Sequence, residues 1–174
     1  NKVLKYLDPQ KEDKILEIGC ARGVLTKEVQ KLAPDTHGVD LNKEAIEQGV
    51  TGNLHVNSAD KLDFPDETFD KVFSFHTIEH VPDAKAMLNE MARVLKPGGQ
   101  ALLAYPAEGV QGFFAIRSAW MFFKNPFRAR EIHVRKLTPS SMKKLAAESD
   151  LDYVDSEFAL LNIPQFFTLL KDPS

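Results

Sequence analysis

The stretch from Lys14 to Gly23 constrains the fold of this chain more than any other. A short apolar run over 15–18, interrupted by Glu17, is followed by Gly19 and Gly23, and apolar residues then recur at helical spacing. This order predicts a buried strand, a tight turn and a helix. Glycine at position 19 lets the backbone turn sharply and lets a ligand approach closely. Because ligands bind beyond the carboxyl ends of strands in open α/β sheets, the turn is predicted to form a ligand site.

The glycine spacing and a nearby carboxylate indicate which ligand this turn suits. A dinucleotide-binding turn has the pattern G-x-G-x-x-G and directs a helix N-terminus at a pyrophosphate. Here the glycines are Gly19 and Gly23, and the carboxylate of Glu17 before them would repel a pyrophosphate. The arrangement suits a ligand with an amino group and hydroxyls. Asp40 ends the next predicted strand, where a carboxylate can accept hydrogen bonds from both hydroxyls of a ribose.

Predicted strands and helices alternate along the rest of the chain. Runs rich in apolar and β-branched residues predict strands at 14–18, 36–40, 54–57, 70–75, 100–105 and 153–160. Apolar spacing and capping residues predict helices at 3–7, 24–33, 43–48, 84–95 and 139–148. This alternation predicts an α/β fold, with a doubly wound, mostly parallel sheet in an α/β/α sandwich. We expect one domain over residues 1–174, and further residues upstream because the first residue is Asn1 rather than methionine.

Two segments leave details of the sheet open. The residues from Leu95 to Gly99 predict a turn that ends the preceding helix. Residues 162–170 do not alternate clearly as a strand, so they indicate either a helix after Pro164 or an incomplete sheet edge. The number of strands at that edge is therefore left undecided.

From these motifs the chain resembles the class I S-adenosylmethionine-dependent methyltransferases, in the small bacterial-type branch with a type 11-like domain. The motifs that carry the resemblance are Leu16–Gly23, Gly38–Asp40, Phe64–Asp70, Glu79–Asp83 and Leu95–Gly99. They occur in the family's order over most of the chain. One departure is Ala21, which stands where the family has the middle glycine of its Glu/Asp-x-Gly-x-Gly-x-Gly loop and could weaken cofactor binding.

The resemblance implies a cofactor, S-adenosylmethionine, with S-adenosylhomocysteine as its product, and a role for each matching residue. The methionine end is assigned to the loop residues Glu17, Gly19, Cys20 and Ala21 and to the backbone at Phe75 and His76. The adenosine end is assigned to Asp40 for the ribose, to Leu41 against the adenine, and to Asp60 with the backbone of Ala59 for the adenine edge. Two of these residues have simpler alternatives: Cys20 as a small buried filler and Asp60 as the cap of a turn.

Methyl transfer to an acceptor is a direct in-line displacement, which mostly requires alignment of the reacting atoms. A general base is needed only if the acceptor arrives protonated. His76, directly after the predicted strand 70–75, is the better placed candidate base. His80 lies in a motif that is more often structural in the family, and we expect it, Tyr105 and His133 to contact the acceptor.

An insertion at about 106–136 is expected to act as a lid over the acceptor. Residues 113–136 combine aromatic and basic side chains, with Glu131 as the acidic exception. Aromatic side chains lining the acceptor site, with basic side chains at its rim, favour a small-molecule or lipid-like acceptor. Two alternatives are an ordinary packed segment with a solvated basic face, and a helix that contacts a membrane surface or a partner.

Composition excludes several other classes of protein. A net charge of −3, and the lack of an Asn-Pro-Pro-Tyr-like tetrapeptide after strand 70–75, make a nucleic-acid acceptor unfavourable. The histidines lack the paired spacing of a metal site. The single cysteine and the absence of a long apolar run indicate a cytoplasmic protein that spans no membrane. The alternative to an enzyme is a non-catalytic binding or scaffold protein on the same fold, which Ala21 would favour.

Overall fold

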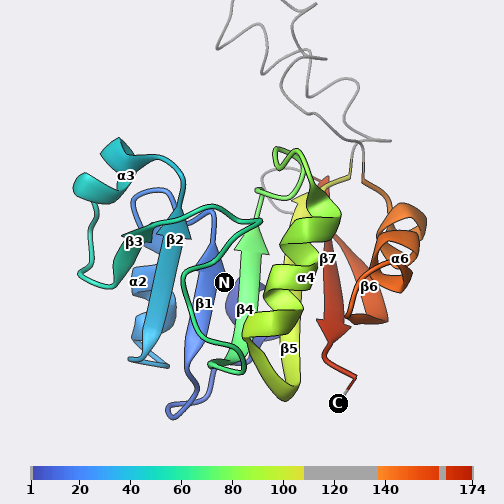
Figure 1. The fold of residues 1–174 in the computed structure, drawn as a ribbon, viewed down its shortest axis with the longest axis horizontal. Coiled ribbons are helices and arrows are strands. Elements are labelled where there is room, and N and C mark those ends of the chain that lie inside the picture. Colours follow the sequence, from blue (N-terminus) through green and yellow to red (C-terminus); the bar gives the residue numbers. More distant parts are fainter. Residues whose placement is uncertain (1, 108–136, 161–163, 174) are drawn as a thin grey trace, which may run out of the picture.

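The computed structural model describes residues 2–107, 137–160 and 164–173. Its centre is a seven-stranded sheet with the strand order β3-β2-β1-β4-β5-β7-β6 (Figure 1). Strands β1 to β5 are parallel to one another, whereas β7 runs antiparallel to both β5 and β6. This is the doubly wound, mostly parallel sheet that the alternating pattern predicted.

Most predicted elements agree with the structure to within a few residues. The strands are β1 Ile15–Ile18, β2 Thr36–Asp40, β3 Leu54–Val56, β4 Phe69–Phe75, β5 Leu95–Pro106, β6 Asp152–Leu160 and β7 Pro164–Lys171. The helices are α1 Lys2–Leu7, α2 Val24–Gln30, α3 Lys43–Glu47, α4 Ala84–Val94 and α6 Pro139–Ala147. Short side chains cap three of these helices: Asn42, Asp83 and Thr138 each accept a hydrogen bond from a backbone N–H in the first turn.

The C-terminal segment forms a strand, so the prediction of a helix or an incomplete edge there was wrong. β7 pairs with β5 from Gln165 opposite Pro106 to Lys171 opposite Gln100. The alternation was hidden because β7 lies between two strands and buries side chains on both faces. The turn expected at 95–99 is likewise part of β5, with Leu95 paired to Phe69 before a register shift.

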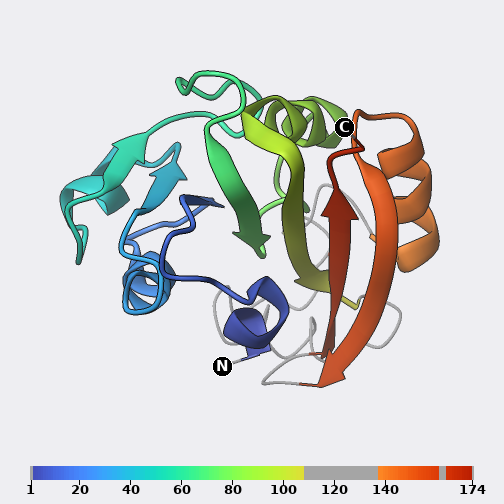
Figure 2. The ribbon, with the colours of Figure 1, turned by 90° about the horizontal axis from the view of Figure 1, so that it is seen from below.

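Helices cover both faces of the sheet and create two apolar cores. Seen from below, α1 and α2 lie on one side of the sheet and α4 and α6 on the other (Figure 2). The larger core joins α4 and α6 to the sheet through Met87, Met91 and Met142. The smaller core joins α1 and α2 to the opposite face through Leu7 and Val29. The sandwich therefore buries most of the sheet, and the ends of its strands are where polar groups gather.

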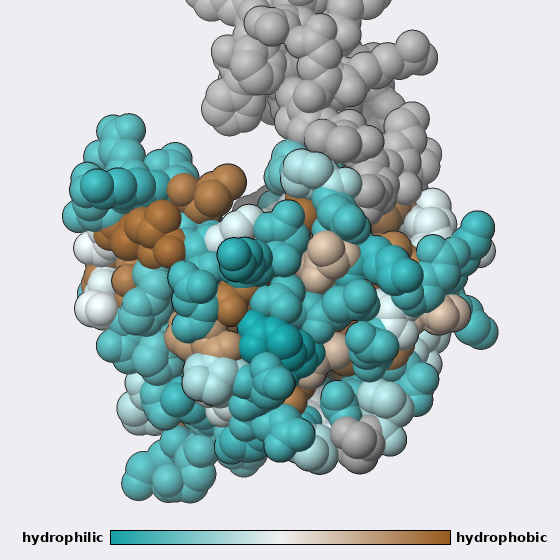
Figure 3. Space-filling view, in the orientation of Figure 1, coloured by the Kyte–Doolittle hydropathy of each residue, from teal (hydrophilic) through white to brown (hydrophobic). Residues whose placement is uncertain are grey.

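The face of the molecule seen in Figure 1 is mostly hydrophilic. Its apolar atoms concentrate over the β2 and β3 end of the sheet (Figure 3). Exposed large apolar side chains from this end include Leu41, Val50 and Val56. None of the helices in the described ranges is long and apolar enough to cross a membrane.

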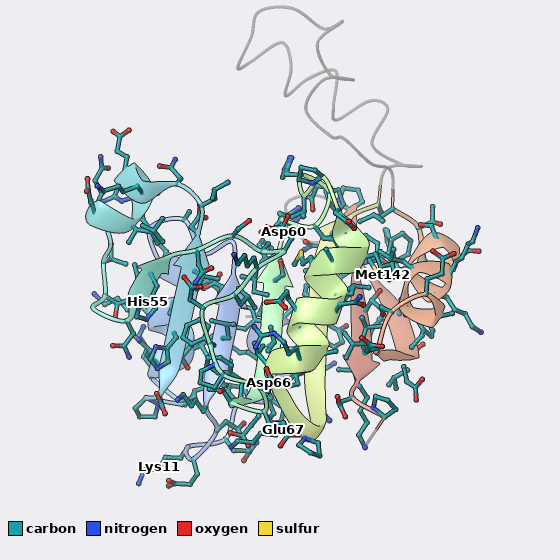
Figure 4. The ribbon with its side chains drawn as sticks, viewed as in Figure 1. Lys11, His55, Asp60, Asp66, Glu67 and Met142 are labelled. Atoms are coloured by element: carbon teal, nitrogen blue, oxygen red, sulfur yellow. The ribbon has the colours of Figure 1, made fainter. Side chains whose placement is uncertain are left out.

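The crossover from β3 to β4 is held to α4 by Arg93. Its guanidinium donates to the backbone oxygens of Leu62 and Phe64 at 2.8 Å and to Asp66 at 2.7 Å. It also forms an ion pair with Glu90, which accepts the backbone N–H of Leu62 at 2.6 Å. Figure 4 shows that this segment runs from Asp60 at the upper edge of the sheet to Asp66 at the lower edge. Arg93 therefore fixes the path of a long loop by replacing its missing backbone partners.

Replacing Arg93 by methionine should lower the free energy of unfolding by about 1–3 kcal/mol, because two backbone oxygens and Glu90 lose their donor. Urea unfolding followed by circular dichroism measures this. The matched control is Lys144→Met on α6, whose side chain is exposed and pairs only loosely with Glu148 at 4.0 Å. Equal free energies of unfolding for the two variants would contradict the role of Arg93 in holding the β3–β4 crossover to α4.

Candidate functional site

The carboxyl ends of β1, β2, β4 and β5 meet at the upper edge of the sheet in Figure 1. Because parallel strands end at the same edge, the loops that follow them are neighbours in space. Asp60, in the loop after β3, lies at this same edge (Figure 4). The predicted site residues that the structure describes are thus brought to one rim or to the core directly beneath it.

The loop after β1 depends on two glycines in the left-handed region of backbone space. Gly19 has φ +79° and Gly23 has φ +73°. A Cβ on Gly19 would lie 2.0 Å from the Oγ1 of Thr77, which follows β4. The backbone N–H of Gly19 donates to the Val39 oxygen at 2.8 Å. The sharp turn that the glycine pattern predicted is present, and the structure adds that the loop packs between the ends of β2 and β4.

Ala21 also adopts the left-handed region, with φ +48°. An L-residue there costs about 1 kcal/mol relative to glycine, which explains why the family loop favours glycine at this position. The backbone N–H of Ala21 donates to Asp40 Oδ2 at 2.7 Å. That hydrogen bond compensates for the strain, so the departure from the family pattern leaves the loop tied to β2.

Asp40, at the end of β2, holds its carboxylate at the mouth of this loop. Besides the bond from Ala21, its Oδ1 accepts the backbone N–H of Asn42 at 2.8 Å. Each carboxylate oxygen has a further lone-pair site, so both can still accept a hydroxyl. Next to it, the apolar side chain of Leu41 is 73% exposed. An exposed leucine beside a fixed carboxylate is a surface that suits a planar apolar base with a hydroxylated sugar.

Glu17 is buried below the loop instead of lying at its mouth. Its carboxylate accepts a 2.5 Å hydrogen bond from the hydroxyl of Thr26 on α2. Desolvation by burial raises the pKa of Glu17 to about 7, against the lowering effect of the Thr26 bond, and the charge of Asp40 adds to the rise. Thr26 was not recognised from the sequence, although a threonine within a helix next to the glycine loop is a detectable signal. The predicted contact of Glu17 with the methionine end stays a prediction.

Cys20 is buried within the same loop. Burial, together with the nearby carboxylates of Glu17 and Asp40, raises the pKa of its thiol to about 12. A thiol with so high a pKa is a poor nucleophile. Its sulfur would lie 2.9 Å from a Cβ placed on Gly38, so the glycine of β2 makes room for it. The side chain of Cys20 thus suits the role of a small buried filler. Contact of its backbone with a cofactor is compatible with that role.

Asp60 lies in a tight turn between Ser58 and Lys61. It is exposed, and its Oδ1 accepts the Ser58 hydroxyl at 2.5 Å. Ala59 packs against the larger core, which anchors the turn below Asp60. Capping the turn and reading an adenine edge both fit this geometry, so the adenine contact stays a prediction.

His76, after β4, is held from three sides. Its backbone has φ +54°, which is uncommon outside glycine and marks a constrained position. Its Nε2 lies 2.7 Å from the Gln165 Oε1 of β7, and its Nδ1 lies 3.4 Å from Glu79 Oε1. The ring also contacts that of Phe75, with centroids 4.4 Å apart. Gln165 was missed from the sequence, because nothing local marks a residue 89 positions away as a partner.

The residues expected to contact an acceptor are placed differently from one another. The side chain of His80 is 47% exposed and lies at the rim. Tyr105 is fully buried, and its hydroxyl lies 2.8 Å from that of Thr168, so this side chain packs between β5 and β7. Its contact with an acceptor stays a prediction that this burial does not favour. His133 and the lid expected within 106–136 lie almost entirely outside the described residues, as does the membrane contact expected through 113–136.

Strand order, glycine loop and the carboxylate that ends β2 together define a Rossmann-like methyltransferase domain. A family model described as "Methyltransferase domain" matches residues 1–156. The chain belongs to this methyltransferase family, whose cofactor is S-adenosylmethionine. Within the described residues no group of three or more metal-ligating side chains comes together.

Two curated relatives of modest identity carry the same name. The Ubiquinone biosynthesis O-methyltransferase of Cupriavidus pinatubonensis is 25% identical over 170 residues, covering 91% of this chain and 68% of that protein. The protein of the same name from Aliivibrio fischeri is 26% identical over 151 residues, covering 79% of this chain and 63% of that protein. The chain thus spans about two thirds of the length of these relatives.

Solved structures share the fold. A SAM-dependent methyltransferase from Methanosarcina mazei aligns with a TM-score of 0.74 at 20% identity, covering 99% of this chain and 97% of that chain. A SAM-dependent methyltransferase from Aquifex aeolicus aligns with a TM-score of 0.71 at 14% identity, covering 98% of this chain and 88% of that chain. At these identities the likeness establishes the architecture, and the chemistry depends on the residues described above.

Replacing Gly19 by alanine should reduce affinity for S-adenosylhomocysteine at least tenfold and lower the free energy of unfolding by about 1–3 kcal/mol. The new methyl group would meet Thr77 at 2.0 Å on a backbone that L-residues rarely adopt. Calorimetric titration and urea unfolding measure the two effects. Gly52→Ala is the control, since a Cβ there meets no atom within 4 Å. Unchanged affinity in Gly19→Ala would contradict a role of this loop in cofactor binding, and unchanged stability would contradict its close approach to Thr77.

Glu17→Gln should stabilise the chain increasingly as pH rises. The pKa of Glu17 is about 7 in the folded state against 4.5 normally, so the folded state binds more protons between these values. Stability from this group is therefore greatest below about pH 4.5 and decreases up to about pH 7. Glutamine does not ionise, so Glu17→Gln removes this loss of folding stability, which is at most about 3 kcal/mol. Urea unfolding of both proteins at about pH 5 and pH 8 measures the difference, and a gap that does not grow with pH would contradict it.

Proposed function

We propose that this domain transfers a methyl group from S-adenosylmethionine to a hydroxyl oxygen of a small-molecule or lipid-like acceptor. The observation that carries the proposal is the pairing of histidine and glutamate at the end of β4, beside the cofactor loop. A hydroxyl arrives protonated, so its methylation benefits from a nearby proton acceptor. The names of the curated relatives, which are O-methyltransferases, support an oxygen acceptor.

The described residues fit the cofactor at the points where its polar and apolar parts differ. Asp40 retains acceptor sites for two hydroxyls, and Leu41 offers an apolar surface next to it. Asp60 at the rim can accept from an exocyclic amino group. When bound, the cofactor supplies an activated methyl group on a sulfonium. The protein then has to align the acceptor, exclude water and receive a proton.

An acceptor of modest size fits the chain better than a nucleic acid. The net charge is −3, which gives no general attraction to phosphates. The aromatic and basic composition of residues 113–136 favours an acceptor with an apolar body and a polar or acidic group. Small-molecule and lipid-like acceptors share this chemistry and differ in the size of the apolar part. Methyl transfer to a series of catechols with alkyl chains of increasing length therefore distinguishes them.

Asp40→Asn should weaken S-adenosylhomocysteine binding by about 10- to 100-fold, because hydrogen bonds to a charged acceptor contribute about 1.5–3 kcal/mol. Calorimetric titration measures the dissociation constant. Asp155→Asn is the control, since Asp155 lies on β6 at the far end of the sheet. If Asp40→Asn binds like the unchanged chain, the ribose assignment fails.

The acceptor is tested with radiolabelled S-adenosylmethionine. Label should transfer to catechols in the unchanged chain and not in Gly19→Ala, whereas DNA and peptide pools should remain unlabelled. Transfer to DNA or peptide alone would overturn the proposed acceptor class. Absence of cofactor binding in the unchanged chain would overturn the enzymatic function itself.

A further inference from the structure

Two histidines on neighbouring parallel strands point to the same face of the sheet at its β3 end. His37 lies on β2 and His55 on β3, 18 positions further along the chain. Val39 is paired with His55, and His37 shares the face of Val39 because successive side chains of a strand alternate. Figure 4 shows His55 at this end of the sheet, away from Asp60 and the rim. The pair therefore lies outside the site described above.

A carboxylate fixes the tautomer of His37. The Nε2 of this ring lies 2.8 Å from Asp35 Oδ1. A carboxylate accepts hydrogen bonds, so Nε2 carries the proton and Nδ1 of the neutral ring carries a lone pair. That Nδ1 lies 3.3 Å from His55 Nε2, which donates to it. Asp35 thus directs the lone pair of His37 towards the ring of His55.

Aromatic rings hold the two imidazoles in place. Phe64 packs edge-to-face against both of them, with ring centroids 6.2 Å from His37 and 5.8 Å from His55. Phe69 contacts His37 in the same manner at 6.2 Å. The side chain of His37 is 21% exposed, and His55 is exposed. The pair is therefore held by protein contacts and is also accessible from solvent.

The separation of the two nitrogens matches that of two ligands on one metal ion. Zinc binds imidazole nitrogens at about 2.0–2.1 Å in tetrahedral geometry, which places two of them about 3.3–3.4 Å apart. His37 Nδ1 and His55 Nε2 are 3.3 Å apart. For both to bind an ion, the proton on His55 Nε2 moves to Nδ1 of the same ring, and this exposed ring turns until the two lone pairs converge. Asp35 then occupies the orienting position that a carboxylate takes behind a metal-bound histidine.

We propose that His37 and His55 bind a late first-row divalent metal ion, such as Zn²⁺ or Cu²⁺, with Asp35 as the positioning residue. Imidazole suits these ions, whereas Mg²⁺ and Ca²⁺ prefer oxygen ligands. The described residues contain no group of three or more side chains that could hold a metal, so this pair supplies two ligands and water completes the shell. A bound ion would link β2 to the edge strand β3. The site needs neither cofactor nor acceptor, so it stands apart from the proposed function.

The test is calorimetric titration of the chain with zinc chloride at about pH 7.5, where imidazoles are mostly neutral. One ion should bind per chain, and magnesium chloride should not bind. His37→Gln and His55→Gln should each weaken zinc binding about tenfold or more, and Asp35→Asn about 10- to 100-fold. The control His80→Gln, which changes a histidine at the rim, should bind zinc like the unchanged chain. Absence of saturable binding, or binding that His37→Gln and His55→Gln both retain, would overturn the site.

A second measurement identifies the ligand atoms in the unchanged chain, so it does not depend on the folding of any variant. Ring ¹⁵N resonances are followed by NMR as zinc is added. His37 Nδ1 and His55 Nε2 should shift together, while the ring nitrogens of His76 stay in place. Zinc should also raise the urea midpoint of the unchanged chain but not that of His55→Gln, because an ion that binds the folded state stabilises it. Shifts at His76 or His80 without shifts at His37 and His55 would overturn the assignment.

Discussion

The contact between Gly19 and Thr77 is the constraint on which the rest of the site depends. It brings the loop after β1 against the turn after β4, with no space for even a methyl group between them. Because β1 is the central neighbour of both β2 and β4, one close approach fixes the relative positions of three strand ends. The glycine loop, the Asp40 carboxylate and the turn that carries His76 are thereby held as one rim.

Polar groups around this rim form two separate systems. One is acidic and belongs to the β1 loop: below the loop Glu17 accepts a hydrogen bond from Thr26, and at its mouth Asp40 accepts one from the loop backbone. The other lies at the end of β4, where Glu79 faces two imidazoles. The first system suits the binding of an amino group and hydroxyls, and the second suits the movement of a proton. Their separation allows binding and chemistry to be changed independently by mutation.

Sequence patterns predicted the parts of the molecule that local rules determine. The Gly19 turn, the Asn42 and Asp83 caps, the strands from β1 to β4 and the part of β5 from residue 100 onward follow from local conformation and apolar spacing. The sequence patterns did not predict β7, because its burial on both faces hides the alternation of apolar and polar residues. They also gave no indication of the Gln165–His76 bond, which exists only because β7 inserts beside β5. The depth of Glu17 and the burial of Tyr105 likewise depend on packing that single-sequence periodicity does not contain.

The position of β7 has a consequence for how the chain acquires its shape during synthesis. β7 is the last described strand to leave the ribosome, yet it lies between β5 and β6. Until it pairs, β5 presents an unpaired edge, and β6 has no neighbour in the sheet. A nascent chain can therefore complete the β3-β2-β1-β4-β5 half early, but His76 gains its Gln165 partner only at the end. Intermediates that expose the β5 edge are the stage at which this protein is most open to misassociation.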